Sequence, residues 1–533
     1  MKFRPLFAWI LAVLTLPSLL LAASPAKKPY NVLFIISDDL NNMLGCYGDP
    51  IAKTPNIDRL AARGVRFDRA YCAFPLCGPS RNSMLTGLYP NSTGILTNSL
   101  IFRQTIPDQI SLSQAFRHAG YFAGRIGKLY HYNVPNSIGT DGHDDPGSWE
   151  LELNPAGVDR LEEHPKIFSL TPRQFGGTLS WLASTSGDAA HTDGKIAADA
   201  EWVLERCAKQ KDRPFFLAVG FFRPHTPYVA PKKPYFDLYP RDKMRVVPGI
   251  KEDQADLPPA ALGSYKAEQD KLTDDLRREA LQAYYASISF MDAQVGRVIG
   301  ALDRLGLADS TIVVFTSDHG YHTGEHGLWQ KQSVFEESAR VPLLMVAPGV
   351  TKKGTVAKAP VSHVDLYPTL AELAGVSAPS NLQGQSLVPM LANVAIPGRG
   401  WALTQVMRGG AGGGAAKAGK VAKTDAKTKV RSKIKSPDGK VAKGALSETR
   451  FAGYSLRTPR WRYTEWADGD KGRELYDHDS DPKELANLAQ KPEHAKTVAE
   501  LSVRIRAAAL ASFPASGKTP ELAPGLWAPI LLK

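Results

Sequence analysis

Four groups of residues in this chain have the types and spacing that chemistry requires. In chain order they are Asp38-Asp39, Cys77-Gly78-Pro79-Ser80-Arg81, the scattered set Lys128, His131, His225 and Lys331, and Asp318-His319. Adjacent carboxylates are the oxygen ligands that a hard divalent cation prefers, and an Asp beside a glycine turn can add another. Each group alone is also compatible with an ordinary cap, turn or surface position. The prediction therefore depends on the four groups occurring together.

The cysteine group is the most specific of the four. Pro79 can stand in the first turn of a helix, where its missing N–H is not needed, so a helix is predicted to begin there. Cys77 would then lie near the positive end of that helix, which favours anionic chemistry. Arg81 would follow one turn later and could point back toward Cys77. A lone cysteine is usually a small buried hydrophobe, but Cys-x-Pro-Ser-Arg followed by Leu85-Thr86-Gly87 is a much narrower pattern.

Short apolar runs place several of these groups at the ends of strands. Continuous apolar runs occur at 29–38, 214–219, 311–316 and 341–346, and helical patterns separate them at 54–63, 111–119, 194–209 and 275–305. Continuous runs are typical of strands buried on both faces, and their alternation with helices predicts an α/β domain with a mostly parallel sheet. In such sheets the site lies beyond the carboxyl ends of the strands. Reactive residues follow directly after the first three runs.

The pattern changes in the last quarter of the chain. Residues 451–465 and 474–477 alternate as antiparallel strands do, and 495–510 has a helical pattern. The sequence therefore predicts a catalytic α/β domain over residues 30–395 and a smaller C-terminal α+β subdomain over 396–533. Within the latter, 409–447 is rich in Gly, Ala and Lys and cannot bury a core, which predicts a basic, disordered insertion. Docking onto a polyanionic substrate or a cell surface is the alternative for this segment.

Composition and charge narrow the class of protein. The chain has 533 residues, of which 43% are hydrophobic and 22% charged, which is typical of a globular protein. Ten Lys or Arg and two Asp between positions 409 and 446 supply +8 of the formal net charge of +12. Because the basic character is mostly local, it does not indicate a nucleic-acid partner. The four cysteines are too few for a disulfide framework, although a Cys72–Cys207 or Cys46–Cys72 bridge remains open.

The amino terminus predicts export. Residues 1–23 have a basic start, an apolar run broken by Pro17, and a small-residue exit, as secretory signals do. An uncleaved membrane anchor is the alternative. No later apolar run is long enough to cross a bilayer, so we expect a secreted or periplasmic protein without stable membrane association once the signal is removed.

Together these motifs resemble the type I sulfatase family, and the cysteine motif resembles that family's signature for oxidation to formylglycine. The resemblance extends from about residue 31 to 487. It includes Asp38-Asp39, Pro55-Asn56-Ile57-Asp58-Arg59-Leu60-Ala61, Gly127-Lys128, Pro224-His225-Thr226-Pro227, Asp318-His319-Gly320, Gly324-Glu325-His326-Gly327 and Lys331. Within the family the chain looks most similar to the iduronate-2-sulfatases, which share Gly127-Lys128-x-x-His131 and His after Asp318. The fold implied is an alkaline-phosphatase-like sheet flanked by helices.

The resemblance also implies roles. One calcium ion would be held by Asp38, Asp39, Asp318 and His319, with residue 77 completing the shell after a maturation enzyme converts Cys77 to formylglycine. The hydrated aldehyde offers one hydroxyl to attack sulfur and a second whose deprotonation then expels sulfate, an exit that a thiol lacks. Arg81 would hold the hydrate, Lys128 and Lys331 would neutralise sulfate oxygens, His131 would serve as base, and His225 as acid.

The substrate expected is a sulfated carbohydrate, but the residues leave two other functions open. A phosphonate monoester or phosphodiester hydrolase of the same superfamily can use the same Cys-x-Pro-x-Arg pattern, although no second set of metal ligands is evident in the sequence. A non-catalytic sulfoglycan-binding protein could instead use the basic segment 409–447. The sugar and the sulfate position are not specified by the sequence.

Overall fold

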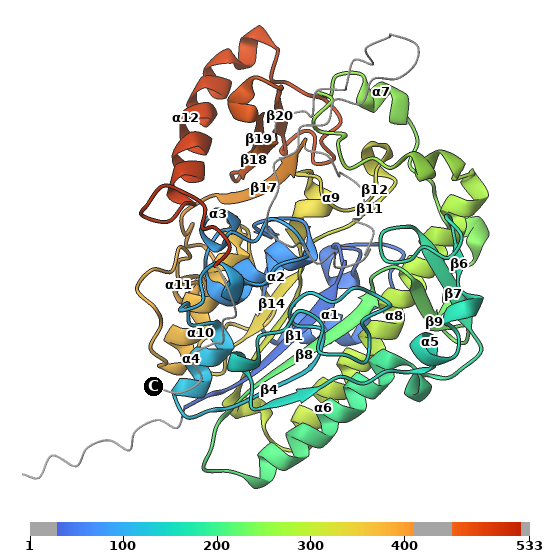
Figure 1. The fold of residues 1–533 in the computed structure, drawn as a ribbon, viewed down its shortest axis with the longest axis vertical. Helices are drawn as coiled ribbons and strands as arrows, with labels where there is room; N and C mark the ends of the chain where they lie inside the picture. Colours follow the sequence, from blue (N-terminus) through green and yellow to red (C-terminus); the bar gives the residue numbers. More distant parts are fainter. Residues whose placement is uncertain (1–28, 410–449, 524–533) are drawn as a thin grey trace, which may run out of the picture.

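The computed structural model of the protein describes residues 29–409 and 450–523 (Figure 1). The predicted secretory signal, 1–23, lies outside these ranges, as does nearly all of the predicted insertion 409–447. None of the helices in the two described ranges combines the length and the hydropathy needed to cross a bilayer.

An eight-stranded sheet forms the centre of the molecule (Figure 1). Its strands, in spatial order, are β15 (Thr355–Ala357), β2 (Val65–Phe67), β14 (Leu343–Val346), β10 (Thr311–Ser317), β1 (Asn31–Asp38), β8 (Phe215–Pro224), β4 (Phe122–Gly127) and β5 (Leu151–Leu153). The strands from β10 to β5 are parallel, whereas β14 runs antiparallel to both of its neighbours. The predicted mostly parallel α/β sheet is therefore confirmed.

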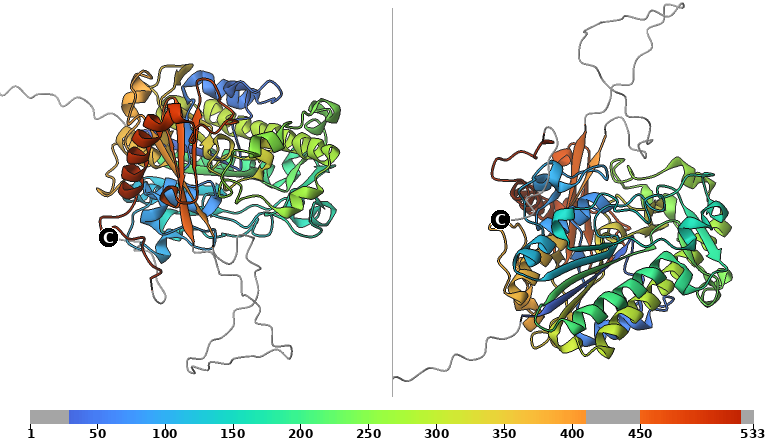
Figure 2. Two further views of the ribbon diagram at one scale, coloured as in Figure 1. Left: turned by 90° about the horizontal axis from the view of Figure 1, so that it is seen from above. Right: turned by 60° about the horizontal axis from the view of Figure 1, so that its bottom comes forward.

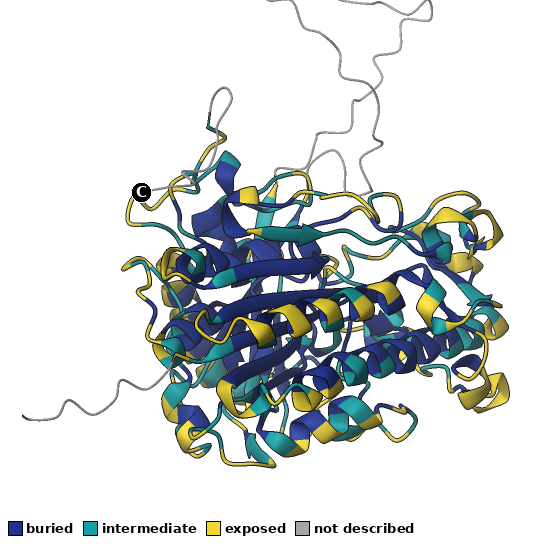
Figure 3. Ribbon diagram, turned by 90° about the horizontal axis from the view of Figure 1, so that it is seen from below, coloured by how far each residue is buried: buried dark blue, intermediate teal, exposed yellow. Residues whose placement is uncertain are grey.

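Helices cover both faces of this sheet (Figure 2). One face carries α1 (Pro55–Arg63), α6 (Thr192–Lys209) and α8 (Asp274–Arg304), and the other carries α2 (Cys77–Thr86), α4 (Leu112–His118) and α10 (Leu366–Ala374). The central strands are buried, whereas α6 and α8 expose their outer surfaces to solvent (Figure 3).

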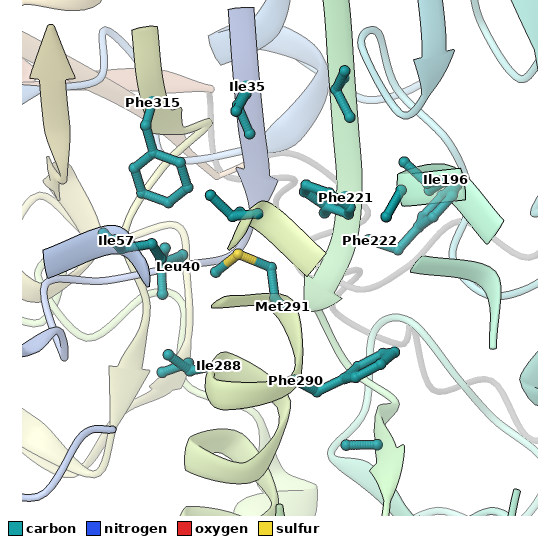
Figure 4. Close-up of a cluster of buried hydrophobic side chains, with 14 of the residues drawn as sticks. Ile35, Leu40, Ile57, Ile196, Phe221, Phe222, Ile288, Phe290, Met291 and Phe315 are labelled. Atoms are coloured by element: carbon teal, nitrogen blue, oxygen red, sulfur yellow. The ribbon is translucent and has the colours of Figure 1, made fainter. Parts of the chain in front are cut away.

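The position of β1 between two hydrophobic cores explains why its sequence is almost continuously apolar. Its Leu33 and Ile35 belong to the core on the α8 face, where Figure 4 shows Ile35 near Met291, and Phe34 belongs to the core on the opposite face. Because alternate side chains of one strand enter two different cores, nearly every position of β1 must be apolar.

The described residues form four smaller sheets besides the central one. One is antiparallel and contains β17 (Ala402–Arg408), β18 (Phe451–Arg457), β19 (Trp461–Trp466) and β20 (Arg473–Asp477), against which α12 (Ala495–Ala511) packs. The others are β6 (Phe168–Ser169) with β7 (Ser180–Ser184) and β9 (Tyr228–Pro231), β11 (His322–Thr323) with β12 (Trp329–Gln330), and β13 (Arg340–Val341) with β3 (Ala70–Tyr71) and β16 (Val361–Ser362). The antiparallel strands and last helix expected near the carboxyl end are thus confirmed, and the boundary at 395/396 stays a prediction.

Short helices occupy the connections between these sheets. They are α3 (Pro90–Thr93), α5 (Val158–Leu161), α7 (Ile250–Gln254), α9 (Glu336–Ala339) and α11 (Val388–Ala392). All four cysteines are free, so neither of the disulfides left open by the sequence is formed in this structure.

Candidate active site

The carboxyl ends of four adjacent parallel strands bring the predicted residues together. Asp38 ends β1 and is paired with Pro224 of β8, which directly precedes His225. Ser37 is paired with Ser317 of β10, the residue before Asp318. Gly127 at the end of β4 is paired with Gly220 of β8, and Lys128 follows it. One edge of the sheet therefore supplies side chains from four distant parts of the chain, as expected for an open α/β sheet.

Helix α2 brings Cys77 to the same place. The helix begins at Cys77 itself rather than at the predicted Pro79, so Cys77 stands in its first turn at the positive end of the helix dipole. Cys77 Sγ lies 3.3 Å from His319 Nε2, 3.3 Å from Lys331 Nζ and 3.9 Å from Asp39 Oδ1. Burial raises the pKa of the Cys77 thiol despite the two nearby lysines, so the unmodified side chain stays protonated and is a weak nucleophile.

Arg81 lies one helical turn after Cys77 and is fully buried. Its Nε donates to Asp318 Oδ2 at 2.9 Å, and its Nη2 donates to Asp38 Oδ1 at 3.0 Å. Its Nη1 donates to the carbonyl oxygens of Lys128 and Leu129 at 2.7 and 3.1 Å. Arg81 therefore fixes the relative positions of two predicted metal ligands and of the segment that carries Lys128.

Asp39, Asp318 and His319 present a set of donors that fits a divalent cation. Their ligand atoms and Cys77 Sγ all lie within 4.8 Å of one another. The His319 Nδ1–H donates to Gly320 O at 2.9 Å, which leaves the Nε2 lone pair 3.3 Å from Asp39 Oδ1 and 3.5 Å from Asp318 Oδ2. A second-nitrogen hydrogen bond of this kind is what orients metal-binding histidines.

Two further observations bear on the same cation site. Asp39 Oδ2 is buried without a hydrogen-bond partner among the residues described, and burial raises the pKa of Asp39 despite the attraction of nearby Lys331. Asp38 differs from Asp39, because Arg81 and Lys128 already hold its two oxygens. Although burial opposes it, the attraction of Lys128 and other nearby cations, including Arg81, keeps the pKa of Asp38 well below its usual range.

Two lysines flank the carboxylates. Lys128 Nζ donates to Asp38 Oδ2 at 2.5 Å, and Lys331 Nζ donates to Asp39 Oδ1 at 2.5 Å. Although burial opposes it, the neighbouring Asp39 raises the pKa of Lys331, which is therefore a cation at all physiological pH values. Gln330 and Gln332, on either side of Lys331, have left-handed backbones with φ of 76° and 72°. Such backbone strain is commonly found at functional sites.

The two predicted proton carriers are both buried at the site. His225 donates its Nδ1–H to Thr226 O, which leaves Nε2 3.6 Å from Asp39 Oδ2. The His131 ring lies 5.6 Å from the ring of His143, and its Nδ1 has no hydrogen-bond partner in the described part of the chain. Burial lowers the pKa of both imidazoles, and nearby Lys331 and Lys128 lower them further, so both are neutral at pH 7.

Three other buried histidines, His322, His326 and His363, lie outside this cluster. His326 donates to Asp253 at 3.0 Å and faces Glu337, so it orders the segment before Lys331. His363 contacts Thr316 Oγ1 at 3.0 Å in the core, which agrees with a packing role. His322 is fully buried, and its Nε2 lies 2.6 Å from Ser333 Oγ.

Sequence reasoning missed a layer of tyrosines beneath Asp39. Tyr284 donates its hydroxyl to Asp39 O at 2.8 Å, and its ring stacks on Tyr321 with centroids 5.3 Å apart. The Tyr228 hydroxyl donates to the Tyr321 hydroxyl at 2.6 Å. These three residues come from α8, β9 and the turn after β10, so no local pattern could have linked them. They support Asp39, whose own backbone is left-handed with φ of 62°.

Comparison with known proteins agrees with this geometry. Residues 30–376 match the Sulfatase family. The chain is 38% identical over 382 residues to a sulfatase of Formosa agariphila. The aligned region covers 68% of this chain and 73% of that protein. It is 30% identical over 530 residues to the iduronate 2-sulfatase of Mus musculus, and that alignment covers 88% of this chain and 92% of the relative. The predicted similarity to iduronate-2-sulfatases is confirmed at this moderate level.

Solved structures agree on the fold. A phosphonate monoester hydrolase of Agrobacterium radiobacter superposes with a TM-score of 0.68 at 24% identity, over 90% of this chain and 96% of that one. A structure solved with D-glucosamine-2-N,6-O-disulfate gives a TM-score of 0.66 at 21% identity, over 91% and 98%. At identities this low, the superpositions show a shared fold and nothing about the reaction. The match to the family model spans more than half of the sequence, and on that ground this chain belongs to the sulfatase family and is a sulfuric ester hydrolase.

Proposed function

We propose that this chain hydrolyses sulfate esters of a carbohydrate, using a hydrated formylglycine formed from Cys77 and one calcium ion. The observation that carries the proposal is the position of Cys77 at the amino end of α2, between Lys331 and the facing groups of Asp39, Asp318 and His319. A protonated, buried thiol would be a poor nucleophile there, whereas a hydrated aldehyde supplies two hydroxyls at the same point.

Asp39, Asp318 and His319 would hold the calcium ion, with residue 77 as a further ligand. Asp38 would complete the set while remaining bonded to Arg81 and Lys128. When bound, the ion supplies positive charge that acidifies a neighbouring hydroxyl and orients sulfate oxygens. Oxygen donors dominate this set, as calcium prefers, and the imidazole of His319 is the one nitrogen ligand.

The remaining side chains divide the work of charge and proton transfer. Lys331 and Lys128 bring fixed positive charges to the place where the sulfate oxygens would lie, and neither needs to reorganise during the reaction. His131, neutral at pH 7, suits the role of base. The negative charge of a bound sulfate raises the pKa of a nearby imidazole, which is what His225 needs in order to protonate the leaving oxygen.

Relatives favour a carbohydrate substrate. Besides the iduronate 2-sulfatase, the chain is 27% identical over 551 residues to an N-acetylglucosamine-6-O-sulfatase of Bacteroides thetaiotaomicron. A choline-sulfatase of Rhizobium meliloti is 33% identical over 392 residues, so a small non-sugar ester is the alternative to test. The phosphonate monoester hydrolase shares only the fold at its identity of 24%. Export to the periplasm or the exterior, guided by residues 1–23, and contact with a formylglycine-generating enzyme are parts of the same proposal.

The test combines mass and turnover. The peptide that carries residue 77 should lose one sulfur and two hydrogens and gain one oxygen on maturation, which intact mass analysis detects. Matured protein should hydrolyse 4-nitrophenyl sulfate faster than bis(4-nitrophenyl) phosphate, and Cys77→Ala should abolish sulfate ester hydrolysis. Full activity of Cys77→Ala would refute the nucleophile, and faster phosphodiester turnover would favour the phosphorus hydrolase instead. Deleting 409–447 should leave hydrolysis of the aryl sulfate intact.

A further inference from the structure

A lysine outside the predicted catalytic set lies between two segments of the active site. Lys266 is half-buried and directly precedes the short 3-10 helix η8 (Ala267–Lys271). Its Nζ donates to Gln330 Oε1 at 2.6 Å and to the backbone oxygen of Gly177. Gln330 is the residue before Lys331, so one of the two contacts reaches the turn that carries a predicted sulfate-binding cation.

The other contact leads to the strand end that carries His225. Gly177 is followed by Thr178, whose carbonyl oxygen accepts the Thr226 hydroxyl at 3.1 Å. Thr226 in turn follows His225 directly. The ammonium of Lys266 is thus held between the His225 segment and the Lys331 segment, although it is more than 35 residues from either in sequence.

Lys266 makes no ion pair with a carboxylate in the described part of the chain. Within residues 29–409 and 450–523, no Asp or Glu oxygen lies within the 4.0 Å that defines an ion pair, and both of its recorded acceptors are neutral oxygens. The nearest acid in sequence, Glu268, instead accepts a hydrogen bond from Thr171 at 2.7 Å. Burial lowers the pKa of Lys266 to about 8, although the attraction of Glu268 opposes the shift, and the side chain is still mostly protonated at pH 7.

The carboxylates of the predicted metal site do not need Lys266 as a counter-charge. The three buried carboxylates, those of Asp38, Asp39 and Asp318, are paired with three buried or nearly buried cations, Arg81, Lys128 and Lys331. A partly buried cation that makes no ion pair is costly to keep, so its retention beside an active site points to an anion that arrives with the substrate.

We propose that Lys266, positioned by Gln330 and Gly177, binds a second anionic group of the sulfated sugar, either a carboxylate or a further sulfate. The inference rests on the proposed sulfatase function and narrows its substrate to sugars with at least two negative charges. A lysine ammonium is a compact point charge that can accept either kind of anion. Gln330 directly precedes Lys331, so Lys266 contacts the same turn that carries the other anion-binding lysine.

Matched pairs of substrates test this inference on the matured protein. One pair is a 2-O-sulfated hexuronic acid and its methyl ester, and the other is a hexosamine disulfate and the corresponding monosulfate. The wild type should prefer the more highly charged member of at least one pair. Lys266→Met should reduce kcat/KM for that member about ten- to hundredfold more than for its partner, because a charged hydrogen bond is lost. Lys266→Arg should retain most of the preference, and Lys271→Met, an exposed control at the end of η8, should not alter it.

The outcomes separate the possible explanations. A preference lost only in the first pair identifies the carboxylate, and one lost only in the second identifies the further sulfate. An equal loss on both members of each pair would mean that Lys266 only braces the fold, and would overturn the inference. Wild-type protein that hydrolyses 4-nitrophenyl sulfate without any preference for charge would also overturn it, while leaving the proposed function in place. If no sulfate ester is hydrolysed at all, the proposed function itself fails.

Discussion

Arg81→Met tests whether one buried guanidinium maintains both the stability of the protein and the geometry of its active site. Arg81, Asp38 and Asp318 are each 0% exposed, and the two ion pairs have N–O distances of 3.0 and 2.9 Å. In the variant Asp38 keeps Lys128, but Asp318 keeps only two backbone N–H donors and the nearby imidazole of His319. A buried carboxylate would then lack its main compensating charge.

The magnitude follows from these contacts. Removing one partner of a buried ion pair costs about 3–5 kcal/mol of unfolding free energy, because the other charge is left desolvated. Activity should fall roughly a hundredfold, or about 3 kcal/mol of barrier, because Asp318 and Asp38 are no longer fixed where the reaction requires them. Urea denaturation gives the first quantity, and kcat for an aryl sulfate, measured well below the unfolding transition, gives the second.

Arg462→Met provides a matched control. Arg462 is equally buried in β19 and pairs with Glu336 and Glu484, and its Nη1 donates to Val334 O at 2.8 Å. It contacts none of the predicted catalytic residues, so its variant should lose a similar unfolding free energy and retain most of kcat. Wild-type kcat in Arg81→Met, or equal losses of kcat in both variants, would refute the proposal that Arg81 orients the site.

Three further predictions concern the cation, a close backbone contact and a buried charge. A chelator should abolish turnover and lower Tm, and added calcium should restore both, because a ligand that binds only the folded state stabilises it. A Tm that does not change with calcium would contradict the proposed calcium site. Gly320→Ala should destabilise the protein and weaken calcium binding, because a Cβ would lie 2.0 Å from Glu337 O and must displace the turn that holds His319; a wild-type calcium affinity by calorimetry would show that the turn can yield. Although burial opposes it, Asp253 and Glu337 raise the pKa of His326, so its contribution to stability is complete below the unfolded pKa of about 6.5 and is lost as pH rises through the folded value. The stability deficit of His326→Gln in urea should thus be larger near about pH 6 than near about pH 10, and a deficit that grows with pH would be inconsistent with a protonated His326.

Much of the site could be predicted because its residues stand where strands end. Residues 32–36 before Asp38-Asp39 are all apolar since both faces of β1 enter a core, and residues 312–315 before Asp318 are apolar for the same reason. Parallel strands put their carboxyl ends at one edge, so the sequence alone could bring these acids together. The prediction was weaker where strand direction depends on distant pairing, as for β14, which is antiparallel to β10.

By itself, then, the sequence determined the fold class, the family and the identity of the reactive residues, because those follow from local patterns and short motifs. Only the tertiary structure decided which partners these residues have. Arg81 was expected to hold residue 77, yet its donors go to Asp38, to Asp318 and to backbone oxygens. Lys266 carried no recognisable motif, and its position beside Gln330 arises from contacts 64 residues apart. Hydrogen bonds and ion pairs of this kind depend on where whole segments pack, which no spacing along the chain encodes.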